Sequence, residues 1–189
     1  GITVFIGPGH NGGDGAAIAR ELFLKGFFVK VWYPFPIKKT LTNNHLNYLT
    51  SIGVTKLVEP PDANGKELWI DAVFGNNQTR KVDDKLIKLF NQKFHNNYGK
   101  VISIDIPTGL CPDKGKPFLD NAVKADYTLI IGLHKIGLTQ DSALPFIGEL
   151  HHIDVGVPIS KLSKVDKKIF KVTYKDIKNI DLPSLPKNY

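Results

Sequence analysis

The segment best suited to bind a ligand is a glycine-rich run near the start of the chain, Gly-Pro-Gly-His-Asn-Gly-Gly-Asp-Gly over residues 7–15. Gly7, Gly9 and Gly12 have the spacing G-x-G-x-x-G, which permits a tight turn and lets backbone N–H groups approach a phosphate. A helix beginning behind the run would add a favourable partial positive charge. The motif predicts a phosphate-binding loop, although a turn that only joins a strand to a helix has the same spacing.

Two aspartates lie near the ends of apolar runs farther along the chain. Asp71 is in Trp-Ile-Asp-Ala-Val-Phe-Gly and Asp105 is in Ser-Ile-Asp-Ile-Pro-Thr-Gly. A carboxylate in such a run is costly to bury unless it is paired, hydrogen-bonded or metal-bound, and open α/β sheets bind ligands at the carboxyl ends of their strands. Asn11, Asp71, Asp105 and Thr108 would supply oxygen donors at one edge, a set that suits a hard cation. Each aspartate alone could equally cap a turn or a helix.

Three further side chains have types that occur in functional sites. Lys135 follows an apolar run and could contact an anionic ligand at the same edge, whereas its neighbour His134 is as readily an exposed loop residue. Cys111 is the only cysteine, which excludes an intrachain disulfide and a cysteine-cluster metal site. No histidine is evidently placed to activate it, so a nucleophilic cysteine is not expected.

The elements that must position these residues alternate between strand and helix. We expect strands over 2–6, 27–33, 54–58, 68–74, 101–106, 127–131 and 152–155, and helices over 14–24, 41–52 and 83–94. Near-continuous apolar strands are typical of a parallel sheet covered by helices on both faces. The sequence therefore predicts a three-layer α/β/α, Rossmann-like fold with a mostly parallel sheet. We expect residues 1–165 to form this domain and 166–189 a C-terminal extension or linker.

Composition narrows the class of protein. The chain has 189 residues, 42% of them hydrophobic and 23% charged, which suits one globular domain and excludes a disordered chain. No apolar run approaches the roughly 18 residues of a membrane span, and the single cysteine fits a cytoplasmic location. A chain without methionine that begins in a strand is expected to be part of a longer protein.

The net charge of +7 does not by itself indicate a nucleic-acid partner. Residues 161–189 contain eight lysines and three aspartates, and so carry +5 of the total. The rest of the chain is nearly balanced, and no aromatic-rich RNA-binding motif accompanies the lysines. A solvated basic segment is the more economical interpretation.

An ordinary NAD(P) dehydrogenase is disfavoured by the end of the second expected strand. That site requires an acid for the ribose hydroxyls, but the sequence there is Trp-Tyr-Pro-Phe-Pro-Ile over residues 32–37, without a carboxylate. An NADP-type arginine is also missing, although Lys38 and Lys39 follow.

Together these segments resemble one family, the NAD(P)HX epimerases, also called the YjeF N-terminal domain. The resemblance rests on the glycine run at 7–15, on Asp-Ala-Val-Phe-Gly at 71–75, on Ser-Ile-Asp-Ile-Pro-Thr-Gly at 103–109 and on Lys-Ile-Gly-Leu at 135–138. It implies a Rossmann-like domain that often forms homodimers. It also implies metabolite repair by epimerisation of the R and S forms of hydrated NADH and NADPH (NADHX and NADPHX), with one bound potassium ion per subunit.

The resemblance also implies roles for individual residues. The potassium ligands would be Asn11, Asp71 and Thr108. We expect Asp105 to be catalytic, because a carboxylate at a strand end in apolar surroundings suits acid–base chemistry. Together with the family's expected contacts, Lys135 completes the predicted substrate-binding set: His10, Asn11, Gly12, Gly13, Asp14, Gly75, Asn76, Asn77, Gln78, Thr79, Arg80, Asp105 and Lys135.

The chain departs from the family at several positions. His10 replaces the usual asparagine, Thr108 replaces serine, and residues 75–80 lack a second glycine. Residues 182–189 resemble the junction to an ADP- or ATP-dependent dehydratase in bifunctional relatives. The alternative function is a non-catalytic binding and dimerisation module of the mRNA-decapping scaffold type, which would not need the polar cluster of Asn11, Asp71 and Asp105.

Overall fold

A computed structural model describes residues 1–79, 82–97, 99–156 and 178, and its secondary structure lies in a compact unit over Gly1–Val155. The strands are β1 (Ile2–Ile6), β2 (Val29–Trp32), β3 (Thr55–Lys56), β4 (Leu68–Ala72), β5 (Val101–Ile104), β6 (Tyr127–Ile131) and β7 (Glu149–Ile153). The helices are α1 (His10–Leu24), α2 (Thr40–Ser51), α3 (Asp84–Asn96) and α4 (Leu144–Ile147), with 3-10 turns at Ile136–Thr139 and Asp141–Ala143. The predicted extension over 166–189 lies outside the described residues except for Lys178, so that boundary stays a prediction.

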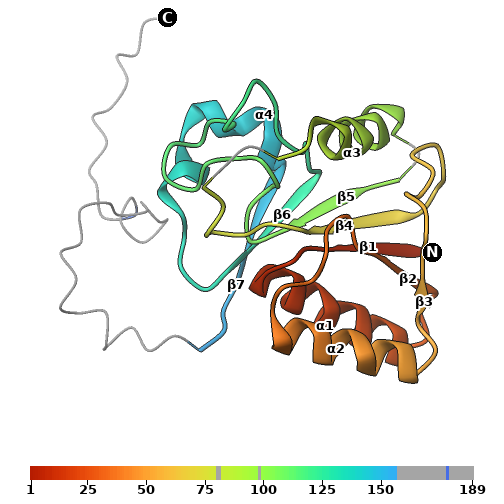
Figure 1. Cartoon of the computed structure of the whole chain (residues 1–189). Helices are drawn as coiled ribbons and strands as arrows, with labels where there is room; N and C mark the ends of the chain where they lie inside the picture. The colour runs from red at the N-terminus through yellow and green to blue at the C-terminus, as the bar shows by residue number, and fades with distance from the viewer. Residues whose placement is uncertain (80–81, 98, 157–177, 179–189) are drawn as a thin grey trace, which may run out of the picture. The chain divides into compact units, whose positions relative to one another are not determined.

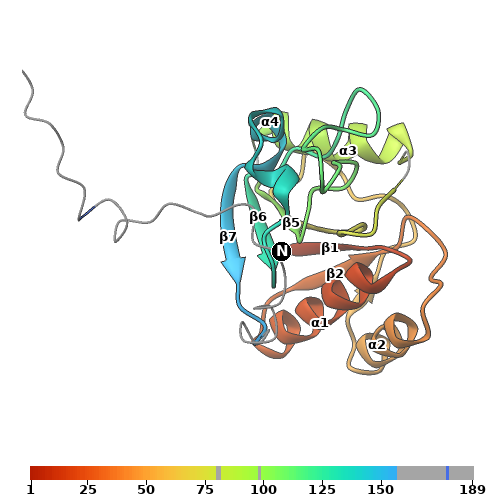
Figure 2. The same ribbon diagram turned by 90° about the vertical axis from the view of Figure 1, so that its left-hand side faces the viewer.

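The strands form one parallel sheet in the order β3-β2-β1-β4-β5-β6-β7. Helices α1 and α2 cover one face and α3 covers the other (Figures 1 and 2). This arrangement confirms the predicted three-layer α/β/α fold. None of the helices in the described residues is long and apolar enough to cross a membrane.

The two faces of β1 show why its sequence forms a buried central strand. All five of its residues are buried. Val4 and Ile6 pack on the side of α1 and α2, whereas Phe5 points to the opposite side, as the alternation of side chains along a strand requires. On that side the centroid of the Phe5 ring lies 4.3 Å from the ring centroid of Phe90 in α3 and 4.8 Å from that of Trp69 in β4. The five residues of β1 therefore contribute to the hydrophobic cores on both faces of the sheet.

Helix α1 begins at His10 rather than at the predicted Asp14. The glycines at 12 and 15 therefore lie inside the helix, where long-range packing accounts for them. A Cβ on Gly12 would lie 2.0 Å from the Gly7 carbonyl oxygen, and one on Gly15 would lie 2.4 Å from the Ala72 side chain. These residues allow α1 to sit directly on β1 and β4, and only Gly7 to Gly9 form the turn.

The last strand and its approach also differ from prediction. β7 is Glu149–Ile153 rather than 152–155, and the short helix α4 was not predicted. β7 is an edge strand whose residues are mostly exposed. It lacks the buried apolar run that marks the central strands, so its bounds could not be read from hydrophobicity.

Parallel pairing brings several strand ends to one edge. The order reverses between β1 and β4, and open α/β sheets bind ligands in the crevice at such a switch point. Phe5 of β1 is paired with Asp71 of β4, and Asp71 with Ser103 of β5. The β1–α1 turn and the segments that follow β4, β5 and β6 therefore surround this crevice.

Candidate active site at the carboxyl edge of the sheet

Asp105 lies in a strained three-residue turn directly after β5. Its φ of 70° is in the left-handed region, and Ile106 N–H donates to the Ile104 carbonyl across it at 2.9 Å. A positive φ closed by such a bond is characteristic of the γ-turn with positive φ, which is rare and strained, unlike the common inverse γ-turn. Strained residues persist where the surroundings hold them and are concentrated at functional sites.

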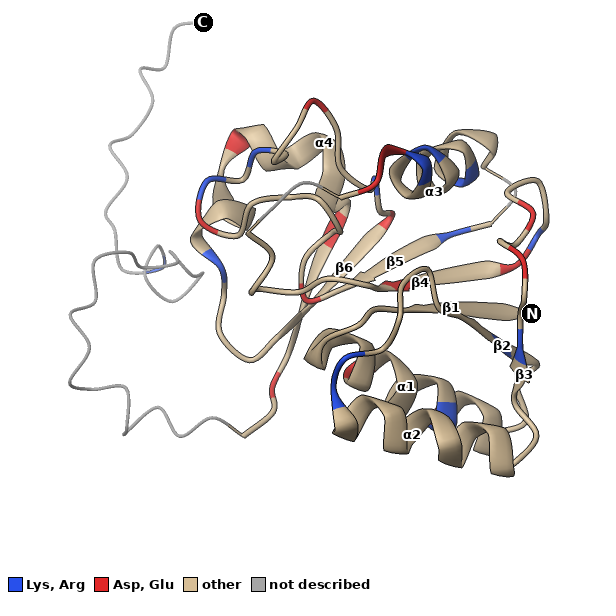
Figure 3. Cartoon of the chain, viewed as in Figure 1, with Lys and Arg blue, Asp and Glu red and all other residues tan. Residues whose placement is uncertain are grey.

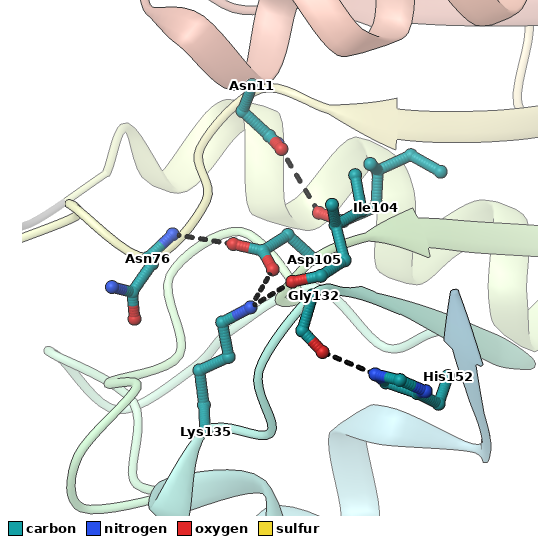
Figure 4. Close-up of polar contacts among 8 residues, drawn as sticks. Asn11, Asn76, Ile104, Asp105, Gly132, Lys135 and His152 are labelled. Atoms are coloured by element: carbon teal, nitrogen blue, oxygen red, sulfur yellow. Dashed lines mark hydrogen bonds and ion pairs between the residues drawn. The ribbon is translucent and has the colours of Figure 1, made fainter. Parts of the chain in front are cut away.

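The Asp105 carboxylate is held by two donors from other strand ends (Figure 4). Asn76 N–H donates to Oδ2 at 3.0 Å, and the Lys135 ammonium donates to Oδ1. Lys135 Nζ also donates to the Ile131 carbonyl at 2.9 Å, which anchors it at the end of β6. Both side chains of the ion pair are 12% exposed. The pair is therefore largely shielded from water yet still reachable.

Asn11 of α1 approaches the same turn from the other side of the crevice. Its Nδ2 donates to the Ile104 carbonyl at 3.4 Å (Figure 4). Gly75 separates the two side chains, since a Cβ there would lie 3.0 Å from Asp105 Oδ2 and 3.1 Å from Asn11 Oδ1. The absence of a side chain at 75 thus leaves room for the amide and the carboxylate to face one cavity.

That cavity has a volume of about 470 Å³, within the range of small-molecule sites. Its lining includes His10 and Asp14 from α1, Asn76 after β4, and Lys39 before α2. Partial burial and then the negative charge of Asp105 raise the pKa of Asp14, while His10 and His45 lower it less. The cavity therefore contains two carboxyl groups in different electrostatic surroundings.

Asp71 is sealed beneath the cavity. It is fully buried, and its carboxylate accepts four hydrogen bonds, all from uncharged donors. Oδ1 accepts from Val73 N–H at 3.2 Å and the Thr108 hydroxyl at 2.7 Å. Oδ2 accepts from the Ser103 hydroxyl at 3.0 Å and Thr108 N–H at 2.9 Å. Burial raises the pKa of Asp71, and these hydrogen bonds oppose that rise.

The structure brings most of the predicted substrate-binding residues together. His10, Asn11, Asp14, Gly75, Asn76, Asn77, Gln78 and Asp105 line the cavity, and Lys135 contacts Asp105. Thr79 lines an adjoining cavity, while Gly12 and Gly13 pack against Gly7 and Thr42. Arg80 lies outside the described residues.

Gln78 has a structural task in this arrangement. Its Nε2 donates to the Pro107 carbonyl at 3.2 Å, and its Oε1 accepts from Gly109 N–H at 2.8 Å. The side-chain amide thereby fixes the turn that follows Asp105, so any contact it makes with a ligand is secondary to this role.

Sequence reasoning did not assign Pro8, Lys39 or Phe74 to the site, yet all three line the cavity. The available signal for Phe74 is its place at the end of the strand expected over 68–74. Lys39 was visible only as a basic residue after β2, because nothing local indicates that this segment folds back. Lys38 N–H donates to the Pro8 carbonyl at 3.1 Å, which brings the segment to the glycine turn.

The chain is similar to known proteins in both sequence and structure. A family model described as YjeF-related protein N-terminus matches residues 1–137. The chain is 37% identical over 171 residues to a Synechocystis protein named bifunctional NAD(P)H-hydrate repair enzyme Nnr, covering 90% of this chain and 32% of that protein. It is 31% identical over 158 residues to the NAD(P)H-hydrate epimerase of Oenococcus oeni, covering 82% and 74%.

A crystal structure of the yeast protein YNL200c has the same fold, with a TM-score of 0.65, 24% identity and coverage of 81% of this chain and 65% of that one. The chain spans about a third of the length of the bifunctional relatives it matches.

Proposed function

The chain belongs to the family of YjeF-related protein N-termini, and from that premise we propose that it epimerises the R and S forms of NADHX and NADPHX. Relatives named NAD(P)H-hydrate epimerase match most of this chain. The observation that carries the proposal is the Asp105 carboxylate, which lines the cavity at the switch point of the sheet and is paired with Lys135. A scaffold module would have no use for a strained, charge-paired carboxylate there.

The chemistry requires a proton to move at one oxygen atom. The two epimers differ at the hydroxylated carbon of the nicotinamide ring, so inversion proceeds by opening of that centre or by loss of the hydroxyl. In the first route the hydroxyl oxygen gives up its proton, the bond from the carbon to the ring nitrogen breaks, the nitrogen takes up a proton, and the ring closes again on the opposite face of the resulting aldehyde. In the second the hydroxyl oxygen takes up a proton and leaves as water, and water adds back to the opposite face of the cation with loss of a proton. Asp105 is the group we assign to the proton transfer at the hydroxyl oxygen, which contributes typically about 10² to 10⁴-fold. Lys135 and Asn76 N–H fix the orientation of its carboxylate.

The substrate's pyrophosphate has a matching region beside Asp105. Among the residues that the structure describes, no side chain caps α1 at Gly9, and the first turn of the helix has no acidic residue. Its first N–H groups are therefore available to an anion. Basic residues lie in the segment that enters α2, close to the start of α1 (Figure 3). Lys39 from that segment lines the same cavity.

Potassium binding by Asn11, Asp71 and Thr108 remains a proposal, and the donor chemistry fits it. All three are oxygen donors, and the buried Asp71 has no cationic partner among the residues that the structure describes. Direct coordination by Asp71 would exchange one of its hydrogen bonds, and the Thr108 and Ser103 hydroxyls can rotate to allow this. A bound ion would add positive charge at the edge where the anionic substrate sits.

The potassium proposal is tested by thermal melting in KCl and in NaCl at equal ionic strength. We expect a higher Tm in KCl, by an amount that grows with concentration. Asn11→Ala is expected to remove the difference. Equal Tm values in both salts for the unaltered chain would contradict the proposal.

The assembly is likewise proposed from the family. We expect a homodimer, measurable by sedimentation equilibrium, and a dehydratase domain fused after this one, as in the relatives named bifunctional. Residues 182–189, which resemble the junction, lie outside the described residues. The cytoplasmic location stays a prediction.

The deciding experiment is direct. Pure R-NADHX is incubated with and without the chain, and the approach to the R/S mixture is followed by chromatography. We expect the chain to accelerate equilibration. An unchanged rate would favour the alternative, a non-catalytic binding module.

A further inference from the structure

A second cavity adjoins the one that Asp105 lines. Its volume is about 420 Å³. The two cavities share Pro8, Phe74, Asn77 and Gln78 in their linings, so one extended ligand can occupy both. We propose that this second cavity binds the adenine of the dinucleotide substrate. This inference rests on the proposed function for the identity of the ligand, but its own contacts can be tested separately.

An aromatic pair gives the second cavity its preference for a flat ring. Phe35, from the segment after β2, and Phe74, after β4, have ring centroids 5.5 Å apart and an interplanar angle of 40°. Both line the cavity, together with the apolar side chains of Pro36 and Val82. Stacking on aromatic side chains is a principal source of affinity for nucleobases.

Charge at the junction between the cavities suits the phosphates that would connect the two ends of the ligand. Lys39 lines the Asp105 cavity and Lys38 lines the second cavity. The backbone of Lys38 is tied to Pro8, which belongs to both linings. A pyrophosphate at this junction would therefore lie between the start of α1 and two lysines, with the nicotinamide on one side and the adenine on the other.

The end of the cavity offers a polar contact for the purine edge. Asp83 lines it and uses Oδ1 to cap α3, accepting from Lys85 N–H at 2.9 Å. Its carboxylate offers an acceptor to an exocyclic amino group such as that of adenine. No carboxylate lies in the sequence at the end of β2 to hold the ribose hydroxyls, so affinity at this end depends on the base.

A larger cavity of about 690 Å³ is the competing location. It is lined by Trp32, Tyr33 and Lys56 among others, and the Lys56 ammonium lies 4.7 Å from the centroid of the Tyr33 ring. It borders the second cavity at Phe35 and Pro36 but shares no lining residue with the Asp105 cavity. Continuity therefore favours the Phe35–Phe74 cavity over this one.

The test measures binding of adenosine 5′-monophosphate (AMP) to the full chain by titration calorimetry. We expect Phe35→Ala to raise the Kd for AMP about tenfold, in line with the loss of one stacking contact. Phe35→Leu keeps apolar bulk in the hydrophobic cluster and is expected to weaken AMP in the same direction. Tyr33→Ala, in the competing cavity, is expected to leave the Kd within about twofold. Circular dichroism confirms that each variant is folded.

The outcomes separate this inference from the proposed function. The inference is overturned if the unaltered chain does not bind AMP, if the folded Phe35→Leu chain binds AMP as tightly as the unaltered one, or if Tyr33→Ala weakens AMP as much as Phe35→Ala. A chain that binds AMP through Phe35 but does not epimerise NADHX would support the adenine site and refute the proposed function.

Discussion

Asp71 and Asp105 occupy similar places in the topology but differ in every contact. Both lie at the carboxyl ends of neighbouring strands, β4 and β5. Asp71 is fully buried and satisfied by uncharged donors, whereas Asp105 borders a cavity and is paired with a lysine. Two of the three residues that donate to Asp71, Ser103 and Thr108, flank Asp105 on both sides. The buried carboxylate therefore braces the strained turn from which the accessible one reaches the cavity.

The largest effect should come from removing the charge of Asp105. Asp105→Asn is expected to slow equilibration of the NADHX epimers by about 10² to 10⁴-fold, because the amide cannot take up or release the proton. Asparagine tolerates the positive φ, but the free energy of unfolding should still fall, because the amide gives up the ion pair with Lys135 and turns its NH₂ group toward either Lys135 or Asn76 N–H. The rate is measured with pure R-NADHX as starting material, and a rate equal to that of the unaltered chain would remove Asp105 from the mechanism.

A matched variant separates the charge of Asp105 from its backbone conformation. Asp105→Ala also removes the carboxylate, but alanine at φ 70° costs about 1–2 kcal/mol. We expect it to match Asp105→Asn in activity and to fall below it in the free energy of unfolding. Equal stability of the two variants would show that the turn is not strained.

For Asp71, which is hydrogen-bonded to buried groups of the protein, we expect substitution to act mainly by lowering the free energy of unfolding. In Asp71→Asn the NH₂ group faces either Val73 N–H or Thr108 N–H, so one backbone donor loses its acceptor whichever way the amide is oriented. Leaving such a donor unsatisfied costs about 1–3 kcal/mol. Urea unfolding should show this loss, and an unchanged midpoint with lost activity would mean that Asp71 acts in the chemistry rather than as a brace.

A substitution at Gly75 can displace the Asp105 carboxylate while residue 105 itself stays an aspartate. The added methyl group of Gly75→Ala would press on Asp105 and Asn11 at 3.0 and 3.1 Å. Since a misplacement of about 1 Å can cost about 10²-fold in rate, we expect the smaller displacement here to lower kcat/KM about tenfold. Gly75 is partly exposed, so the Tm should remain close to that of the unaltered chain. An unchanged kcat/KM would indicate that the carboxylate position is not critical.

The parallel sheet and the meeting of Asn11, Asp71 and Asp105 were predictable because they follow from short-range patterns. Apolar runs identify the buried strands, and parallel pairing then brings their ends to one edge. This reasoning could not distinguish Asp71 from Asp105. The difference depends on Thr108, Lys135 and the γ-turn, and a single sequence does not show which contacts will form across such distances along the chain.

The same limit explains the misplaced start of α1. Gly12 and Gly15 weaken a helix by their propensity alone, so local reasoning placed the start of the helix after most of the glycines. The close approach of α1 to Gly7 and Ala72 requires glycine at both positions. Packing between segments far apart in sequence therefore outweighs propensity here.

The smallest effect is expected at the opposite end of β4, where Glu67 provides a carboxylate with no role in the site. Glu67 Oε1 accepts from Lys30 Nζ at 2.5 Å, and Oε2 from the Thr3 hydroxyl at 2.7 Å. Partial burial raises its pKa, but the hydrogen bonds from Lys30 and Thr3 and the charge of Lys30 outweigh this and lower it below its usual 4.5. Glu67→Gln should therefore cost about 0.5 kcal/mol near neutral pH and leave epimerisation unchanged.

The pH dependence of the stability lost in Glu67→Gln tests whether the Glu67–Lys30 ion pair is its source. A pKa that is lower in the folded state contributes stability above the unfolded value, and this contribution is lost as the pH falls through the folded value. The difference in unfolding free energy between the unaltered chain and Glu67→Gln should therefore be full at pH 6–7 and shrink as the pH falls below 4.5. If the difference stays constant down to pH 3, the ion pair with Lys30 is not its source. A loss of activity in this variant would mean that the two ends of β4 are energetically coupled. Glu67 would then support the geometry of the site, as Asp71 does, although it lies at the other end of the strand.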